Sequence, residues 1–174
     1  MSPETLISEF EAPHSLSLRF AGVPIRVKTN DPEILARLAS YFRPYVVTGP
    51  PALGEVSLIQ GSVPVSGEFV DVVREGGRRP KEATQEVAGG RLVLKRATGV
   101  LIGLRPGGAF AVGDIRRHLN QGINLVNNCY AKVVLRRGHV LLHASAVTRK
   151  ERTAVLAPAP RCTSPSTASS RSRA

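Results

Sequence analysis

The basic residues between positions 81 and 96 have the chemistry to bind an anion such as a phosphate. Arg91 and Lys95 are an even number of positions apart, so they share one face of an extended strand, and Arg96 belongs to the other face. Together with Lys81 they are our candidate phosphate or substrate contacts. Two interpretations stay open, because such a face either binds an anionic partner or is simply exposed to solvent.

His143 is a further candidate contact, and it lies in the apolar run VLLHASAV, which is typical of a buried strand. One interpretation is a core histidine that hydrogen-bonds to a polar neighbour. The other is a histidine at a strand end that contacts a phosphate or transfers a proton, because an imidazole titrates near neutral pH. No partner is visible in the sequence, so both interpretations stay open.

Amide side chains crowd one later segment, although asparagine is unfavourable inside a helix. They recur at helical spacing, which predicts a polar stripe beside an apolar one. The stripe is either the wall of an interface or site, or a hydrogen-bonded seam against a loop. Our candidate polar interface comprises Asn120, Gln121 and Asn124, and the stripe continues through Asn127 and Asn128.

The remaining reactive side chains form no arrangement known to support catalysis. Cys129 and Cys162 are the only cysteines, too few for a disulfide framework or a zinc site. We expect Cys129 to be a small buried residue and Cys162 an exposed free thiol. Neither has a matching His and Asp for nucleophilic catalysis, and the acids are scattered. We therefore predict no catalytic residue, no metal site and no cofactor bound by this chain itself.

Two amphipathic helices are expected to position these groups. The first covers 31–42, where Asp31 can cap the helix and Pro32 suits its first position. The second covers 114–137, where apolar residues recur at spacings of three and four and Gly138 fits the C-cap.

The patterns of most other ordered segments predict strands. One pair of strands is joined by a hairpin turn at Ala21-Gly22, and a second pair by a hairpin turn at Ala97-Thr98. The segments 74–82 and 105–113 are rich in Gly, Pro and charge and are expected to be loops. These elements predict a β-rich fold of the α+β or α/β class. The expected strands cover 16–20, 24–28, 55–60, 68–73, 91–96, 99–104, 140–147 and 153–157.

Length and composition favour one domain in the cytoplasm. The chain has 174 residues, of which 42% are hydrophobic, enough to bury one core. No apolar run reaches about 18 residues, so we expect no membrane association through a span. The acidic N-terminus lacks the features of a secretory signal. We expect a flexible segment over 1–15, a domain over 16–157 and a disordered tail over 158–174, which contains no Leu, Ile, Val, Phe or Tyr.

The net charge of +11 is compatible with several partners. Arginine supplies 19 of the 24 basic residues, which reflects either a GC-rich genome or a phosphate-binding surface. Strongly basic domains can bind nucleic acid. Because the chain has only eight aromatic residues and no Trp, we do not expect a nucleic-acid partner, although that function is kept as an alternative.

Several stretches, in order, resemble the N-terminal portion of HPr kinase-related proteins, the group called HPr kinase-related kinase B. They are RVKTNDPEILARLASYF (26–42), Lys81-Glu82, GGRLVLKRATGV (89–100), NQGINLVNN (120–128), RGHVLLHASAV (137–147) and TAVLA (153–157). The resemblance implies a P-loop serine kinase fold that uses ATP and magnesium, with an HPr-like phosphocarrier or another small protein as substrate.

By the same resemblance, His143 matches the histidine on the strand before the P-loop strand. The residues Lys81, Arg91, Lys95 and Arg96 match the basic stretch upstream of it. The phosphate-binding loop G-x-x-x-x-G-K-[ST] should follow TAVLA, but Pro158 to Thr163 follow instead. Phosphoryl transfer depends on that loop, so we expect no kinase activity from this chain.

The abrupt change of composition after Ala157 leads to the hypothesis of a frameshift or a misplaced stop; a genuine short protein with a basic tail is the alternative. The fold would then be a β-rich region with two amphipathic helices leading into an incomplete P-loop kinase-like sheet. Such a sheet is expected to have open edges, an uncovered apolar face and poor solubility.

Three functions follow from these observations. The first is a truncated, inactive HPr kinase-related protein. The second is a stand-alone binding or regulatory module whose basic strand face holds an anionic protein or a nucleotide. The third is a basic nucleic-acid-binding protein.

Overall fold

The computed structural model describes residues 10–49, 51–63, 67–73 and 79–140, and the backbone of 145–149 and 152–156. The chain divides into two compact units, Met1–His139 and Val140–Ala174. The domain that we expected over 16–157 therefore spans both units. His143, Cys162 and the tail 158–174 lie outside the described residues.

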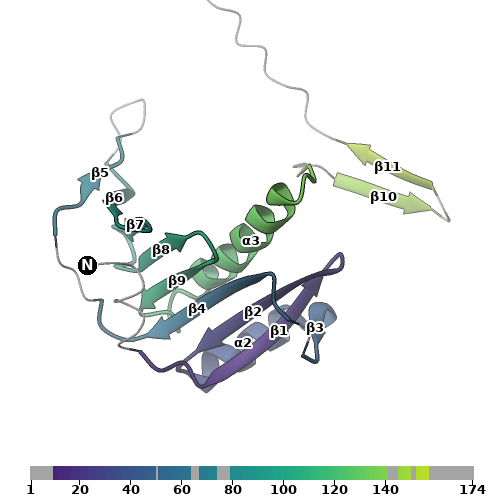
Figure 1. Ribbon diagram of the computed structural model, residues 1–174, viewed down its shortest axis with the longest axis horizontal. Coiled ribbons are helices and arrows are strands. Elements are labelled where there is room, and N and C mark those ends of the chain that lie inside the picture. The colour runs from purple at the N-terminus through teal and green to yellow at the C-terminus, as the bar shows by residue number, and fades with distance from the viewer. Residues whose placement is uncertain are drawn as a thin grey trace, which may run out of the picture. The chain divides into compact units, whose positions relative to one another are not determined.

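The first unit is built on one mixed sheet of nine strands in the order β3-β1-β2-β4-β9-β8-β7-β6-β5 (Figure 1). Strand β2 pairs parallel with β4, and β4 pairs parallel with β9, whereas the other neighbours are antiparallel. The strands are β1 (His14–Phe20), β2 (Val23–Thr29), β3 (Val46–Val47), β4 (Gly54–Gln60), β5 (Val70–Asp71), β6 (Glu82–Val87), β7 (Gly90–Lys95), β8 (Leu101–Arg105) and β9 (Gly108–Gly113).

The hairpin predicted between β1 and β2 is confirmed. Ala21 and Gly22 both have positive φ, 46° and 83°, as a two-residue turn between right-twisted strands requires. The turn fixes the register that pairs Phe20 with Val23 and Leu18 with Ile25.

Both predicted helices are confirmed, one with a shift of its start. Helix α2 (Pro32–Tyr41) begins after Asp31, whose carboxylate accepts hydrogen bonds from the backbone N–H groups of Glu33 and Ile34. A short 3-10 helix, η1 (Arg43–Tyr45), follows it. Helix α3 (Leu119–Arg136) begins later than the predicted 114, because residues 115–118 form turns instead.

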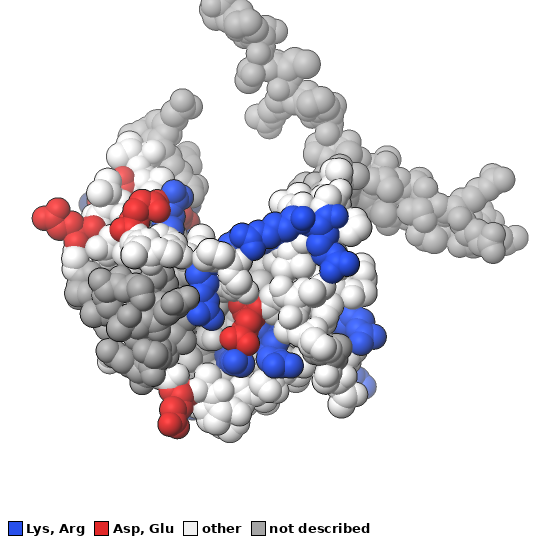
Figure 2. All heavy atoms as spheres, viewed as in Figure 1, with Lys and Arg blue, Asp and Glu red and all other residues white. Residues whose placement is uncertain are grey.

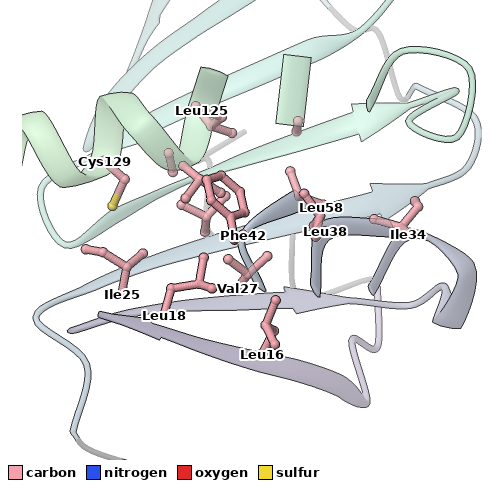
Figure 3. Close-up of a cluster of buried hydrophobic side chains, with 14 of the residues drawn as sticks. Leu16, Leu18, Ile25, Val27, Ile34, Leu38, Phe42, Leu58, Leu125 and Cys129 are labelled. Atoms are coloured by element: carbon pink, nitrogen blue, oxygen red, sulfur yellow. The ribbon is translucent and has the colours of Figure 1, made fainter. Parts of the chain in front are cut away.

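Both helices pack on one face of the sheet. There the strand residues Leu18, Val27 and Leu58 meet Leu38 of α2 and Leu125 of α3 in a shared apolar cluster (Figure 3). A second cluster covers the other face of the central strands. It joins Ile59, Leu92, Leu101, Phe110 and Val112 to Phe10, Val63 and Phe69 from outside the strands.

In the first unit, the second cluster covers the central strands on the face opposite the helices. The uncovered apolar face and open edges are instead expected of the strands that lead into the missing P-loop, over 140–147 and 153–157. Apart from Val140, the side chains of these strands lie outside the described residues, so that expectation stays a prediction. Both edges of the sheet end in two-residue strands, β3 and β5. Such short edges offer little backbone for pairing with another chain.

The prediction of a loop over 105–113 is wrong, because β9 lies within it as a central strand. Every residue of β9 is buried. Its small residues permit close neighbours: a Cβ on Gly108 would lie 2.3 Å from the carbonyl oxygen of Glu55. A strand buried on both faces shows no polar alternation, so its Gly-rich sequence resembles a loop.

Other boundaries also differ from the predictions. Strand β6 (Glu82–Val87) was not predicted, and the strand expected over 68–73 is limited to β5. The turn between β7 and β8 is longer than Ala97-Thr98, since the backbone N–H of Gly99 donates to the carbonyl of Lys95.

The second unit contains an antiparallel hairpin of β10 (Ser145–Arg149) and β11 (Arg152–Leu156). Strands were predicted over 140–147 and 153–157, and residues 141–144 lie outside the described part. In the described parts of the chain, no helix has the length and apolar character needed to cross a membrane.

Candidate functional site

A cavity of about 370 Å³ lies between α3 and the strands β6 to β8. Its strand wall includes Lys95 and the apolar residues Val93 and Ile102, and its helix wall is mostly amide. The structure thus brings Lys95, a candidate contact, together with Gln121 and Asn124 of the candidate polar interface. The helix wall also includes Asn127 and Asn128.

Lys95 does not present a free positive charge to this cavity. Its Nζ lies 2.5 Å from Oε1 of Glu82, its partner in the register of β6 and β7. The two side chains are 24% and 28% exposed. The pair therefore gives the strand wall a cation and an anion side by side, with no net charge.

The other basic candidates of β7 and its turn also face carboxylates. Arg91 pairs with Glu86 across β6 and β7. Arg96 donates to Oδ1 of Asp71 at distances of 2.8 and 3.0 Å. These ion pairs reduce the positive potential of the strand face that we considered for an anionic partner.

Lys81, the fourth basic candidate, is exposed and precedes β6. Its backbone carbonyl accepts the N–H of Arg96, but it does not line the cavity.

The amides of the cavity are available for new hydrogen bonds. Asn124, Asn127 and Asn128 are exposed and Gln121 is half-buried. None of the four makes a side-chain hydrogen bond to another described residue, which does not favour the alternative of a hydrogen-bonded seam. Asn120, the third predicted interface residue, is exposed and lies outside the cavity lining.

The packing of α3 explains why the cavity forms there. Gly122 lets α3 approach β4 closely, because a Cβ at this position would lie 2.9 Å from Cδ1 of Leu58. Strands in a sheet rotate steadily relative to one another, so a straight helix in contact with one part of the sheet separates from another. The amide stripe of α3 lies where this separation leaves room for water.

Cys129 is buried, as predicted, and 6% exposed. Burial raises the pKa of its thiol, and the nearby charge of Lys132 opposes this effect only in part. A thiol that stays protonated is a poor nucleophile. Within the described ranges, no group of three or more His, Cys, Asp or Glu side chains is arranged to hold a metal ion.

A second polar cluster, which we did not predict, joins the carboxyl ends of the parallel strands β2, β4 and β9. The Asn30 side chain exchanges two hydrogen bonds of 2.9 Å with the backbone of Gln60. Oε1 of Gln60 accepts the N–H of Arg116, whose Nε donates to Oδ2 of Asp31 at 2.5 Å. Part of the signal was available in the sequence, since Asn30 directly follows β2 and Gln60 ends β4. Arg116 lies three residues after β9, a strand that was not predicted.

This second cluster is satisfied internally. Burial acts to raise the pKa of Asp31, but hydrogen bonds from Arg116 and from the N–H groups of Ile34 and Glu33 outweigh it, so the pKa lies below its ordinary value. The cluster therefore links the start of α2 to the segment before α3, and the cavity beside α3 is the better candidate for binding.

Comparisons with known protein families, with curated proteins and with solved structures found no match to this chain.

Proposed function

We propose that residues 10–139 form a binding module whose site is the cavity between α3 and β6–β8. The observation that supports this most directly is the set of four amides, Gln121, Asn124, Asn127 and Asn128, which line it without described partners. Each amide offers both donors and an acceptor. A volume of about 370 Å³ falls within the range of small-molecule sites.

The chemistry of the walls favours a small polar ligand without net charge. The pair of Lys95 and Glu82 cancels the charge of the strand wall, so a phosphate gains little there. No aromatic side chain lines the cavity, so a nucleobase has no ring to stack on. A molecule with several hydroxyl or amide groups fits the amides, and its carbon skeleton can contact Val93 and Ile102.

The test is an NMR titration of the full chain with three probes: a disaccharide, a nucleoside and a capped dipeptide. We expect the side-chain amide signals of Asn124 and Asn128 to shift with the disaccharide or the dipeptide. The double variant Asn124→Leu and Asn128→Leu should lose at least tenfold in affinity. Asn120→Leu is the matched control on the same helix and should bind normally.

Two results would contradict this proposal. One is saturable binding that Asn120→Leu weakens as much as the double variant does. The other is the absence of any shift in the four amide signals with all three probes at millimolar concentration.

We also propose that this module belongs to an HPr kinase-related protein. The ordered stretches over 16–157 support this, as does the formation of β11 (Arg152–Leu156) from the segment that the resemblance assigns to the strand before the P-loop. The residues of this chain do not fit ATP and magnesium, since G-x-x-x-x-G-K-[ST] is missing from its sequence. We therefore derive no phosphoryl transfer from it.

Two measurements test this second proposal. The gene should be sequenced from codon 140 onward and translated in all three frames. A frame that continues TAVLA into a P-loop supports the proposal. The absence of a P-loop from all three frames opposes it. The chain itself should then be incubated with ATP, magnesium and an HPr-like protein. We expect no phosphoserine, and its formation would show that our assignment of an inactive chain is wrong.

A further inference from the structure

A second group of cations, two of which have no described carboxylate partner, lies on another face than the one the sequence indicated. Strands β1, β2 and β4 carry apolar residues toward the helices, so their alternate residues face the opposite side. These include Arg19, Arg26 and Lys28, with Arg105 at the end of β8. Figure 2 shows Lys and Arg side chains gathered on this side of the sheet around a small acidic area.

One glutamate, Glu55, lies on this surface and forms ion pairs with two of its cations. Glu55 lies 2.9 Å from Nζ of Lys28 and 3.9 Å from the guanidinium of Arg105. Arg105 can reach across β9 because Gly108, its register partner, has no side chain. Arg19 and Arg26 form no ion pair with a described carboxylate, unlike Arg91, Lys95 and Arg96.

Two cations of α3 extend this surface around the turn between β8 and β9. Nζ of Lys132 donates to the carbonyl of Arg105 at 2.8 Å, and Arg136 donates to the carbonyl of Pro106. Both cations bond neutral carbonyls and keep their full charge. The basic face, as we name it, comprises Arg19, Arg26, Lys28, Arg105, Lys132 and Arg136 around Glu55.

We propose that the basic face binds duplex nucleic acid through its phosphates, without sequence preference. Ser17, the register partner of Arg26, is small and polar, and no aromatic residue is among those that define the face. A protein partner needs apolar or aromatic anchors, and single strands need stacking rings, whereas a phosphate backbone needs neither.

The spacing of the cations agrees with a duplex. Arg26 and Arg105 are separated by three strand-to-strand steps, from β2 through β4 and β9 to β8. Neighbouring strands are about 4.8 Å apart, so the span is about 14 Å. The major groove is about 12 Å wide, so cations at the two ends of this row can meet phosphates on both strands. This inference is independent of the cavity beside α3.

The test measures binding of the full chain to a fluorescent duplex DNA of random sequence by anisotropy, at several salt concentrations. Each phosphate contact contributes about 0.9 to the slope of log affinity against log salt. The double variant Arg19→Ala and Arg26→Ala should therefore reduce the slope by about 1.8 and the affinity at least tenfold. Glu55→Gln should raise affinity several-fold, because it removes the carboxylate.

The matched control removes two arginine charges outside the basic face. Arg43 and Arg117 are exposed and lie outside the basic face, so their double alanine variant should bind within twofold of the parent. Equal losses in both double variants would overturn the proposal, as binding would then follow total charge. So would tighter binding to single strands or to vesicles of anionic lipid than to the duplex.

Discussion

Helix α3 contacts one half of the sheet and faces the other half across a cavity. Over β2, β4 and β9 its side chains are buried, as Val126 is at 0% exposure. Toward β6, β7 and β8 it presents exposed amides, including Asn124 and Asn128, across the cavity. The same helix thus provides a stabilising surface and a candidate binding surface.

The difference shows how one sequence pattern serves two purposes. The apolar stripe of α3 is needed where the helix approaches the sheet closely, as Gly122 allows over Leu58. Where the strands diverge, an apolar stripe would remain exposed to water, and the chain has amides instead. The location of the polar stripe is therefore set by the twist of the sheet as well as by the helix.

The largest expected difference between the two halves of the sheet is in the free energy of unfolding, when one leucine of each half is replaced. Leu58, on β4 under α3, is fully buried, so Leu58→Ala should cost about 3–5 kcal/mol of unfolding free energy. Leu104, on β8 at the cavity, is 37% exposed, and Leu104→Ala should cost less than about 1 kcal/mol. Denaturation in urea measures both. Similar losses for the two variants would contradict the division of the sheet.

Local sequence signals predicted much of the half of the sheet that packs against the helices. The cap and first turn of α2 depend on neighbouring residues, and the hairpin of β1 and β2 depends on Ala21 and Gly22. The central strand β9 depends instead on distant partners. Phe110 packs where Gly103 has no side chain, since a Cβ there would lie 2.0 Å from its ring. No local pattern indicates this contact.

The cavity was predictable only in parts. Strand alternation placed Arg91 and Lys95 on one face, and helical spacing placed Asn124 beside Asn127 and Asn128. That these two surfaces face each other depends on the path of the sheet, which local sequence does not specify. The carboxylates Glu82 and Glu86 were missed as partners because the strand that carries them, β6, was not predicted.

The half of the sheet that packs against the helices also has an interaction that acid should weaken, the one between Asp31 and Arg116. Asp31 caps α2 and binds Arg116, and its folded-state pKa lies below the ordinary value of 3.8. Asp31→Ala should cost about 1–2 kcal/mol near pH 7. A lowered carboxyl pKa stabilises the fold above the unfolded-state pKa of about 3.9, and this is lost as pH falls through the folded value.

Unfolding free energies measured from pH 7 down to pH 2 test this prediction. The difference between the parent and Asp31→Ala should be greatest near neutral pH and shrink below about pH 4, as the carboxyl becomes protonated. Asp31→Asn separates the roles, because an amide oxygen can still cap the helix while the charge is lost. A difference that grows toward acid would contradict the assignment.

The smallest expected effect concerns the ion pair inside the cavity. Lys95 and Glu82 are each about one quarter exposed, at 24% and 28%, in a cavity that water can enter. A double-mutant cycle with Lys95→Met and Glu82→Gln should give a coupling of no more than about 1 kcal/mol. The cycle is needed because Glu82 makes a further interaction that the single variant also removes.

The pair of Arg91 and Glu86 is the matched control, because it crosses the same two strands and is more exposed, at 56% and 68%. Its coupling should be smaller, and high salt should weaken both couplings. A coupling well above 2 kcal/mol for Lys95 and Glu82 would mean that water is excluded from the cavity. The two halves of the sheet would then be packed alike, and the amides of α3 could not exchange water for a ligand.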